Sequence, residues 1–389
     1  MDVSDLRVAL FSGNYNYVRD GANKAQNRLV QTLLEHGAKV RVYAPMVDKP
    51  AFEPTGPLVP IPSVAIPGRG EYRIPLGLSK EAQADLEAFD PHVVHLSSPD
   101  LAARKAAAWA RDRGLPIVAT VHTRFETYPA YYGLGFTQPI IEAWLRRLYA
   151  QCDVLLAPSP TMIEVLRDQR MNPNVEIWSR GVENTIFQPG ARDLAWREEI
   201  GLAEEPPVIE FLGRLVLEKG LGTFAKVLAE LRERGVAHQV MVIGDGPARD
   251  KFAELAPGAV FTGFLAGHDL GRAVASMDML LNPSTTETFG NVTLEAMACG
   301  VPVVAARATG SSGLVVDGTT GRLIEPDDIA GYADALQAYC KDVALAEAHG
   351  RAAAKAAAAY DWEAINMAVA NTYLRLVSER GGGRTVGSA

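Results

Sequence analysis

The sequence lacks several features that would have placed it in other classes of protein. It has only three cysteines, Cys152, Cys299 and Cys340, too widely spaced for a metal or redox motif, which fits a reducing cytoplasm. No apolar run reaches about 18 residues, so no transmembrane helix is predicted. The start, MDVSDLRVALF, does not resemble a signal peptide. No G-x-G-x-x-G follows a strand with an acid about 20 residues on, which disfavours an NAD-dependent dehydrogenase.

Basic residues are also in short supply, and unevenly so. The 389 residues carry a net charge of −8, and the first 180 residues contribute 20 Lys and Arg against 19 Asp and Glu. The excess of acid therefore lies in the remainder, which argues against nucleic-acid binding as the main function. The mixed charges of the first half suit either an anionic membrane surface or, more simply, a solvated face.

The length and the rhythm of the chain predict two α/β domains. Nearly continuous apolar strands, such as 6–11 and 117–122, alternate with helices of 10 to 15 residues, which is typical of parallel sheets covered on both faces. Segment 45–78, rich in Pro and Gly, is expected to be irregular, with short strands as an open alternative, and 183–206 to be a linker. We expect doubly wound, Rossmann-like domains at 1–182 and 207–360, with ligands beyond the carboxyl ends of the strands in a cleft between them.

The most informative stretch runs from Ser284 to Pro302. Glu287 lies in a Thr-rich loop, and Glu295 follows eight positions later on a helix-like run that begins near Gly290. The first turn of a helix offers N–H groups and the positive end of its dipole, which favour carboxylates and phosphates. The hypothesis is a corner that binds a sugar attached to a nucleotide diphosphate. The alternative is that Glu287 is a helix-start acid without a ligand and that Glu295 faces solvent.

Three further loops follow predicted strands of the second domain. GRLVLEKG supplies Arg214 and Lys219, which suit a diphosphate or, alternatively, pair with Glu210 and Glu218 or cap the next helix. GDGPAR is either a phosphate loop or a tight turn with Pro247 at the first helical position. TGFL follows the next strand, and its backbone is suited to meet a flat base.

These stretches resemble a known family. GRLVLEKG, GDGPAR, FTGFL and ETFGNVTLEAMACGVPVVA are similar to the C-terminal domain of the family-4 retaining glycosyltransferases, which have the GT-B fold. RGVENTIFQP resembles the interdomain turn, so the likeness covers nearly all of 180–325. VHTRFETYPAYYG and VVHLSSPD resemble more loosely the lipid-directed branch, which includes α-mannosyltransferases and sulfoquinovosyl diacylglycerol synthases. A helix at 361–380 that crosses back to the first domain, followed by a flexible tail at 381–389, is also implied.

The resemblance implies a role for each matching residue. Arg214 and Lys219 would hold the donor diphosphate, Glu287 the sugar hydroxyls and Glu295 the ribose, while His122 would contact the donor sugar near its reacting carbon. For His122 the alternative is a structural histidine at the end of a strand. The first loop departs from the family, because a single Gly21 stands where paired glycines are usual. The implied catalytic residues are His122, Arg214, Lys219 and Glu287, and the implied donor-binding residues are Gly21, Gly213, Arg214, Lys219, Gly244, Gly263, Phe264, Glu287, Phe289, Gly290, Asn291 and Glu295.

The acceptor side is predicted from an aromatic loop after His122. Its rings, with two arginines on the next helix, suit a lipid acceptor or the membrane interface, and the alternative is a packed lid over the sheet. The residues in question are Phe125, Tyr128, Tyr131, Tyr132, Phe136, Arg146 and Arg147.

The sequence therefore predicts a cytoplasmic retaining glycosyltransferase, peripheral on the inner face of the cell membrane, that moves a sugar from a UDP- or GDP-sugar to a lipid or glycolipid. It contains no Asp-x-Asp, the pair with which metal-dependent glycosyltransferases hold a cation, so neither a metal nor another cofactor is expected. Alternatives are a soluble or polysaccharide acceptor, a sugar-nucleotide epimerase and a non-catalytic nucleotide-sugar sensor.

Overall fold

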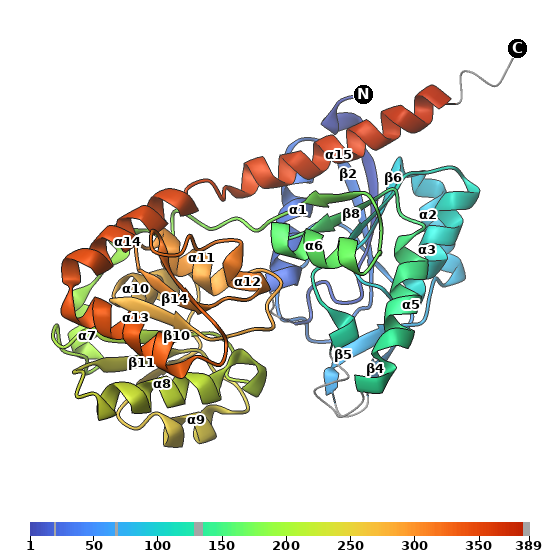
Figure 1. Ribbon diagram of the computed structural model, residues 1–389. Helices are drawn as coiled ribbons and strands as arrows, with labels where there is room; N and C mark the ends of the chain where they lie inside the picture. The colour runs from blue at the N-terminus through green and yellow to red at the C-terminus, as the bar shows by residue number, and fades with distance from the viewer. Residues whose placement is uncertain (19–20, 67–68, 128–134, 384–389) are drawn as a thin grey trace, which may run out of the picture. The chain divides into compact units, whose positions relative to one another are not determined.

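Each half of the chain builds a parallel sheet with helices on both faces (Figure 1). The structure is a computed structural model that describes residues 1–18, 21–66, 69–127 and 135–383. Unit 1 comprises Met1–Ser179 and Trp362–Ala389, and unit 2 comprises Arg180–Asp361. The two Rossmann-like domains expected from the sequence are thus both present.

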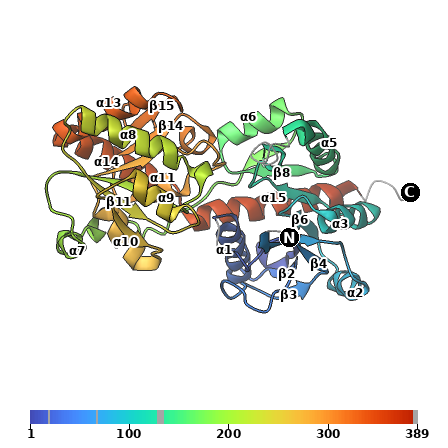
Figure 2. The same ribbon diagram turned by 90° about the horizontal axis from the view of Figure 1, so that it is seen from below.

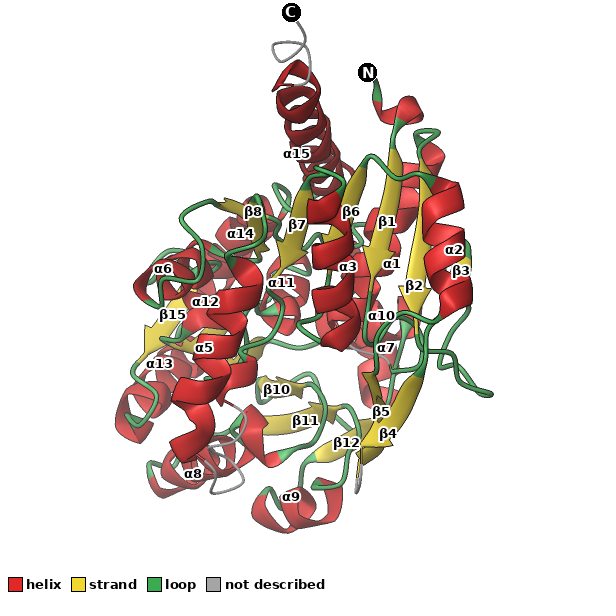
Figure 3. Ribbon diagram, turned by 90° about the vertical axis from the view of Figure 1, so that its right-hand side faces the viewer, coloured by secondary structure: helices red, strands yellow, loops and turns green. Residues whose placement is uncertain are grey.

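The sheet of unit 1 has seven parallel strands in the order β3-β2-β1-β6-β7-β8-β9 (Figure 3). Successive residues of a strand point to opposite faces. In β1, Val8 and Leu10 accordingly pack with α1 and α15, while Ala9 and Phe11 pack with the helices of the other face. The strands are β1 (Arg7–Phe11), β2 (Lys39–Ala44), β3 (Leu58–Pro60), β6 (Val93–Leu96), β7 (Ile117–Thr120), β8 (Val154–Ala157) and β9 (Val175–Ile177).

Three helices of unit 1 begin where a short polar side chain caps them. Ser79, Asp100 and Ser159 each accept a hydrogen bond from a backbone N–H of the first turn that has no partner within the helix. The helices are α1 (Gly21–Glu35), α2 (Lys80–Phe89), α3 (Leu101–Asp112), α5 (Gln138–Tyr149), α6 (Pro160–Asp168) and α15 (Trp362–Gly383).

The last helix, α15, completes the core of unit 1. It lies along α1 (Figure 2), and its side chains Val369, Ala370 and Tyr373 are buried against residues of β1, β2, β6, β7 and β8. The chain therefore returns to the first domain, as expected for the helix predicted at 361–380.

Unit 2 contains six parallel strands in the order β12-β11-β10-β13-β14-β15. One face packs with α8, α9 and α13, and the other with α10, α11 and α14 (Figure 1). The strands are β10 (Val208–Leu212), β11 (Gln239–Ile243), β12 (Val260–Gly263), β13 (Met279–Asn282), β14 (Val303–Ala306) and β15 (Gly321–Ile324). The helices are α7 (Leu194–Glu199), α8 (Leu221–Glu233), α9 (Arg249–Leu255), α10 (Gly267–Ala275), α11 (Asn291–Ala298), α12 (Thr309–Ser312), α13 (Ile329–Lys341) and α14 (Val343–Ala357).

Segment 45–78 contains short strands, which its sequence left open: β3 joins the sheet, and β4 (Ser63–Ile66) pairs antiparallel with β5 (Arg69–Pro75). One expectation about the domains needs correction. Residues 183–206 are not a separate linker, because they belong to unit 2.

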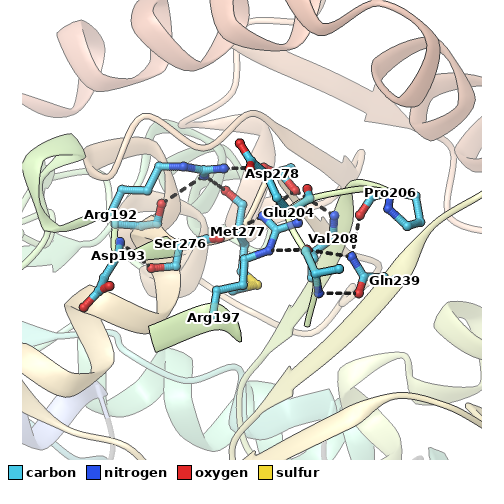
Figure 4. A network of polar contacts seen from close by, with 12 residues as sticks. Arg192, Asp193, Arg197, Glu204, Pro206, Val208, Gln239, Ser276, Met277 and Asp278 are labelled. Carbon is cyan, nitrogen blue, oxygen red and sulfur yellow. Dashed lines mark hydrogen bonds and ion pairs between the residues drawn. The ribbon is translucent and has the colours of Figure 1, made fainter. Parts of the chain in front are cut away.

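A buried arginine holds that segment in place (Figure 4). The guanidinium of Arg197, 1% exposed, donates to Asp278 Oδ2 at 2.9 Å and to the carbonyls of Ala203 and Glu204 at 3.0 and 2.8 Å. Asp278 Oδ2 also accepts the N–H of Val208, the first residue of β10, at 2.8 Å. These bonds connect the segment that contains Arg197 to β10, a central strand of the sheet of unit 2.

Replacing Arg197 by Leu should destabilise unit 2 by about 3–5 kcal/mol, because it removes the buried guanidinium that pairs with Asp278 and bonds to the carbonyls of Ala203 and Glu204. Urea unfolding monitored by circular dichroism measures this. Arg351→Leu breaks an exposed ion pair of the same unit, with Glu347, and should cost at most about 0.5 kcal/mol. Equal effects of the two substitutions would contradict the structural role of Arg197.

Candidate active site

The strand order of unit 2 reverses between β10 and β13. From β10 the chain proceeds outward to β11 and β12, and from β13 it proceeds in the other direction to β14 and β15. The loops after β10 and β13 therefore leave the sheet side by side, and ligands of doubly wound sheets bind at such a point. The two loops touch: Thr286 Oγ1 donates to Glu218 O at 3.3 Å, and a Cβ on Gly220 would meet Pro283 O at 2.9 Å.

An ion pair joins these loops. Lys219, at the end of the short helix η5 (Leu217–Lys219), donates from Nζ to Glu287 Oε1 at 2.8 Å. The Lys219 side chain is 30% exposed and that of Glu287 only 11%, so the pair is partly screened from water. The structure thus unites the cation predicted for the diphosphate and the acid predicted for the sugar. The alternative partners for Lys219, Glu210 and Glu218, are wrong.

Arg214 lies on the same loop as Lys219. Its side chain is exposed, and its guanidinium makes no hydrogen bond or ion pair with any residue that the structure describes. A second cation is therefore accessible at the carboxyl edge of β10.

Glycines bring the GRLVLEKG and GDGPAR loops together. Gly213 and Gly244 have φ angles of +147° and +134°, and a Cβ on Gly244 would lie 2.0 Å from Gly213 O. Leu215 N–H donates to Asp245 O at 3.0 Å, so the GDGPAR loop supports the first loop through its backbone. The alternative that places Pro247 at the first position of a helix is wrong, because α9 begins at Arg249.

A glycine that the sequence reasoning missed sets the position of Glu287. The N–H of Gly290 donates to Gly310 O at 2.9 Å, and a Cβ on Gly310 would lie 2.7 Å from Glu287 Cβ. Only glycine therefore fits at 310 beside this backbone. The signal in the sequence was the run ATGSSG directly after strand β14.

The segment from Phe289 to Asn291 has a structural as well as a predicted binding role. Phe289 is buried, and its ring lies 6.1 Å from that of Tyr360. Asn291 begins α11, and its N–H donates to Phe289 O at 3.2 Å. Phe289, Gly290 and Asn291 thus shape the start of α11, while their contacts with a ligand remain a prediction.

Glu295, predicted to bind the ribose, faces an unexpected second acid. Glu210 on β10 is fully buried, and neither of its carboxylate oxygens has a hydrogen-bond partner among the described residues. Burial, followed by the charge of Glu295, raises the pKa of Glu210 well above its usual value. Cys299, one turn beyond Glu295, has its pKa raised by burial and then by the same two acids. Glu210 is therefore a buried core acid that holds its proton more tightly than usual, rather than a surface partner of Arg214 or Lys219.

The predicted base contact lies at the end of β12. Gly263, the last residue of the strand, has a φ of +73°, and its carbonyl accepts the N–H of Gly244 at 2.9 Å. Phe264 follows with 62% of its surface exposed. The exposed ring of Phe264 and the hydrogen-bonded backbone of Gly263 thus lie beside the GDGPAR loop.

His122 belongs to unit 1 and does not lie in a strand, because β7 ends at Thr120. Its ring is half-buried and packs 5.2 Å from that of Trp178. Gly21 is the first residue of α1.

The predicted acceptor residues that the structure describes are spread over three elements of unit 1, η2 (Phe125–Thr127), η3 (Gly135–Thr137) and α5. Phe125 opens the short helix η2 and is 41% exposed. On α5, Arg146 donates from Nε to Gln169 O at 3.1 Å, whereas Arg147 is exposed. Tyr128, Tyr131 and Tyr132 lie outside the described residues.

Comparison with known proteins identifies the family. The profile described as "Glycosyltransferase Family 4" matches residues 19–185, and that described as "Glycosyl transferases group 1" matches residues 206–342. A GDP-mannose-dependent alpha-mannosyltransferase of Mycolicibacterium smegmatis is 35% identical over 367 residues, which cover 92% of this chain and 95% of the relative. The chain belongs to the family-4 glycosyltransferases.

Other relatives agree with this assignment. Sulfoquinovosyl transferase SQD2 of Arabidopsis thaliana is 31% identical, with 94% of this chain and 72% of the relative covered. Among solved structures, sucrose-phosphate synthase from Thermosynechococcus elongatus has a TM-score of 0.78 at 20% identity and covers 96% of this chain and 100% of its own. WaaG, a glycosyltransferase of lipopolysaccharide biosynthesis, has a TM-score of 0.69 at 20% identity, with 94% and 99% covered. The predicted GT-B fold and the predicted branch of the family are confirmed.

The family-4 enzyme is a retaining glycosyltransferase with a nucleotide-sugar donor, so the epimerase and sensor alternatives are not supported. Among the helices that the structure describes, none combines the length and apolar character needed to cross a membrane.

The buried acid gives a prediction for stability. Because the unfolded chain loses the Glu210 proton near the ordinary pKa of 4.5 while the folded chain keeps it, this residue's contribution to stability falls as pH rises above that value. Glu210→Met should therefore stabilise unit 2 at pH 7.5 by roughly 1–3 kcal/mol, with a smaller gain at pH 5. Thermal unfolding at both pH values measures this, with the exposed Glu254→Met as control. A loss of stability at pH 7.5 would show that Glu210 is held as a favourable ion.

Proposed function

We propose that this glycosyltransferase binds its nucleotide-diphosphate sugar on unit 2 with Lys219 and Glu287 and transfers the sugar, without a metal ion, to a membrane lipid or glycolipid on unit 1. The observation that carries the donor side is the 2.8 Å ion pair between these residues at the strand-order reversal.

One ligand of this class satisfies both partners of the pair. A diphosphate offers anionic oxygens to Lys219 and to the accessible Arg214, while a hexose offers hydroxyl donors to Glu287. During transfer the bond between the anomeric carbon and the diphosphate breaks, and negative charge grows on the leaving oxygen. The two cations stabilise that charge, which is the role a metal ion has in other transferases.

The remaining donor contacts follow from their positions. Glu295 on α11 is proposed for the ribose and Phe264, with the backbone of Gly263, for the base. Because several relatives are GDP-mannose-dependent mannosyltransferases, GDP-mannose is the first donor to try, and UDP-sugars are the alternative.

The lipid acceptor is supported by the surface of unit 1. Phe136 in η3 (Gly135–Thr137) is 76% exposed, and Ile140 in the first turn of α5 is 70% exposed. Two large apolar side chains four residues apart, with the exposed Arg147 on the same helix, suit the interface of an anionic bilayer. We therefore propose peripheral association with the inner face of the cell membrane. A soluble or polysaccharide acceptor is the alternative.

Lys219→Met should weaken binding of the nucleoside diphosphate and lower kcat/KM for transfer about 10²- to 10³-fold, because the cation that binds the phosphates is lost.

Glu287→Gln should leave binding of UDP or GDP nearly unchanged and weaken only the additional affinity conferred by the sugar. Thermal shifts with each nucleotide and its sugar, with transfer assays in EDTA, separate these effects. A ligand at 100 times its Kd adds about 2.7 kcal/mol of stability, which such a panel detects.

Lys226→Met is the matched control, since Lys226 is exposed on α8 of the same unit. Full transfer by both Lys219→Met and Glu287→Gln would refute the proposed donor site. Activity abolished by EDTA and restored only by a divalent cation would refute transfer without metal.

The protein should float with phosphatidylglycerol-containing vesicles but not with purely zwitterionic ones, and the double variant Phe136→Ser, Ile140→Ser should lose most of this binding. Leu255→Ser, which removes a 44%-exposed side chain from unit 2, should bind like the wild type. Binding that is absent, or unaffected by the double substitution, would favour the soluble acceptor.

A further inference from the structure

Trp178 is a fully buried residue placed between two histidines of unit 1. Its ring lies 5.2 Å from that of His122, at an angle of 59°, and 6.0 Å from that of His95, nearly edge-on. Trp178 follows β9 directly and is the penultimate residue of the first segment of unit 1.

The indole of Trp178 is held by the C-terminal helix. Its Nε1–H donates to Oδ1 of Asn366 on α15 at 3.1 Å, and Nδ2 of Asn366 donates to Thr32 Oγ1 on α1 at 3.1 Å. Asn366 is fully buried, so both ends of its amide are fixed by partners that water does not replace. The orientation of the Trp178 ring is therefore set by α15.

A second chain of contacts leads from α15 toward the same segment. The hydroxyl of Tyr373 bonds to His95 Nδ1, and His95 Nε2 bonds to the hydroxyl of Thr120, the last residue of β7. Burial lowers the pKa of His95 to about 3, so its ring is neutral, with one nitrogen donating and the other accepting. His122 follows Thr120 by two residues.

His122 itself lies outside the regular sheet. Residues 121 and 122 belong to neither helix nor strand, although the N–H of Val121 still donates to Leu156 O at 2.9 Å, and the ring contact with Trp178 helps to orient the imidazole. Trp178 is one of the described neighbours of His122. Its ring is rigid because its indole N–H is hydrogen-bonded to Asn366.

We infer that Trp178 and Asn366 are positioning residues, through which the docked helix α15 fixes the ring of His122. The inference rests on the proposed transfer reaction and on the catalytic role that the family resemblance implies for His122, and it adds the means by which a helix near the end of the chain controls the orientation of that side chain. Neither residue needs to touch the substrate.

The test combines kinetics with a direct observation of His122. In full-length Asn366→Leu and Trp178→Phe proteins, kcat should fall about 10- to 100-fold, because a small misplacement of a reacting group costs that much. Affinity for the nucleoside diphosphate should stay unchanged, because its proposed binding residues belong to unit 2. The Cε1–Hε1 NMR signal of His122, assigned by its loss in His122→Gln, should shift in both variants.

Thr372→Val is the matched control. It removes another hydrogen bond of α15, the 2.7 Å contact with Glu176 Oε2, without touching Trp178, and should change neither kcat nor the His122 signal. An unchanged His122 signal together with an unchanged kcat in Asn366→Leu would overturn the inference, and if that variant does not fold, Trp178→Phe decides by the same two measurements.

Failure of the proposed function looks different. Full activity of His122→Gln would remove the catalytic role of His122, whereas the NMR shifts would still show whether Trp178 and Asn366 orient its ring. A loss of kcat in Thr372→Val equal to that in Asn366→Leu would reduce α15 to a general stabiliser and overturn the positioning role.

Discussion

The burial of both faces of each parallel sheet is the constraint on which the rest of the structure depends. It forces the strands to be apolar and leaves their carboxyl-end loops as the places for charged groups. In unit 2 the reversal of strand order between β10 and β13 brings two such loops together, and the 2.8 Å pair of Lys219 and Glu287 spans them. Gly220 matters because it lets these two loops approach closely, whereas Gly213 and Gly244 bring the loops after β10 and β11 together and Gly310, after β14, makes room beside Glu287.

Much of the fold was predictable because burial of both sheet faces requires strands that are nearly continuous apolar runs in the sequence. The strand predicted at 6–11 is β1, Arg7–Phe11, and the strand predicted at 117–122 starts with the first residue of β7, Ile117–Thr120. Other elements lack that signal. In β15 the sequence GRLI carries a glycine and an arginine among four residues, and the Pro and Gly content around β3, β4 and β5 predicts no bounds for these short strands.

The candidate site was predictable residue by residue but not pair by pair. The motifs identified Lys219 and Glu287, yet their partnership joins loops 68 residues apart and depends on β10 lying beside β13. Glu210 was expected at the surface because charged residues are usually exposed to solvent. Side chains along β10 alternate between the two faces of the sheet, and this alternation turns Glu210 toward α11. The surroundings of His122 depend on α15, more than 200 residues further along the chain, and no local pattern reports that contact.

The return of α15 to unit 1 has a consequence for synthesis of the protein. Unit 2 is one uninterrupted stretch, Arg180–Asp361, whereas unit 1 is built from the beginning and the end of the chain. Together with α1, the side chains Val369, Ala370 and Tyr373 cover one face of the first sheet, so part of that face stays uncovered while the ribosome makes the whole of unit 2. The half that emerges first therefore finishes folding last, and the apolar surface awaiting α15 is the part of the nascent chain that most needs protection from aggregation.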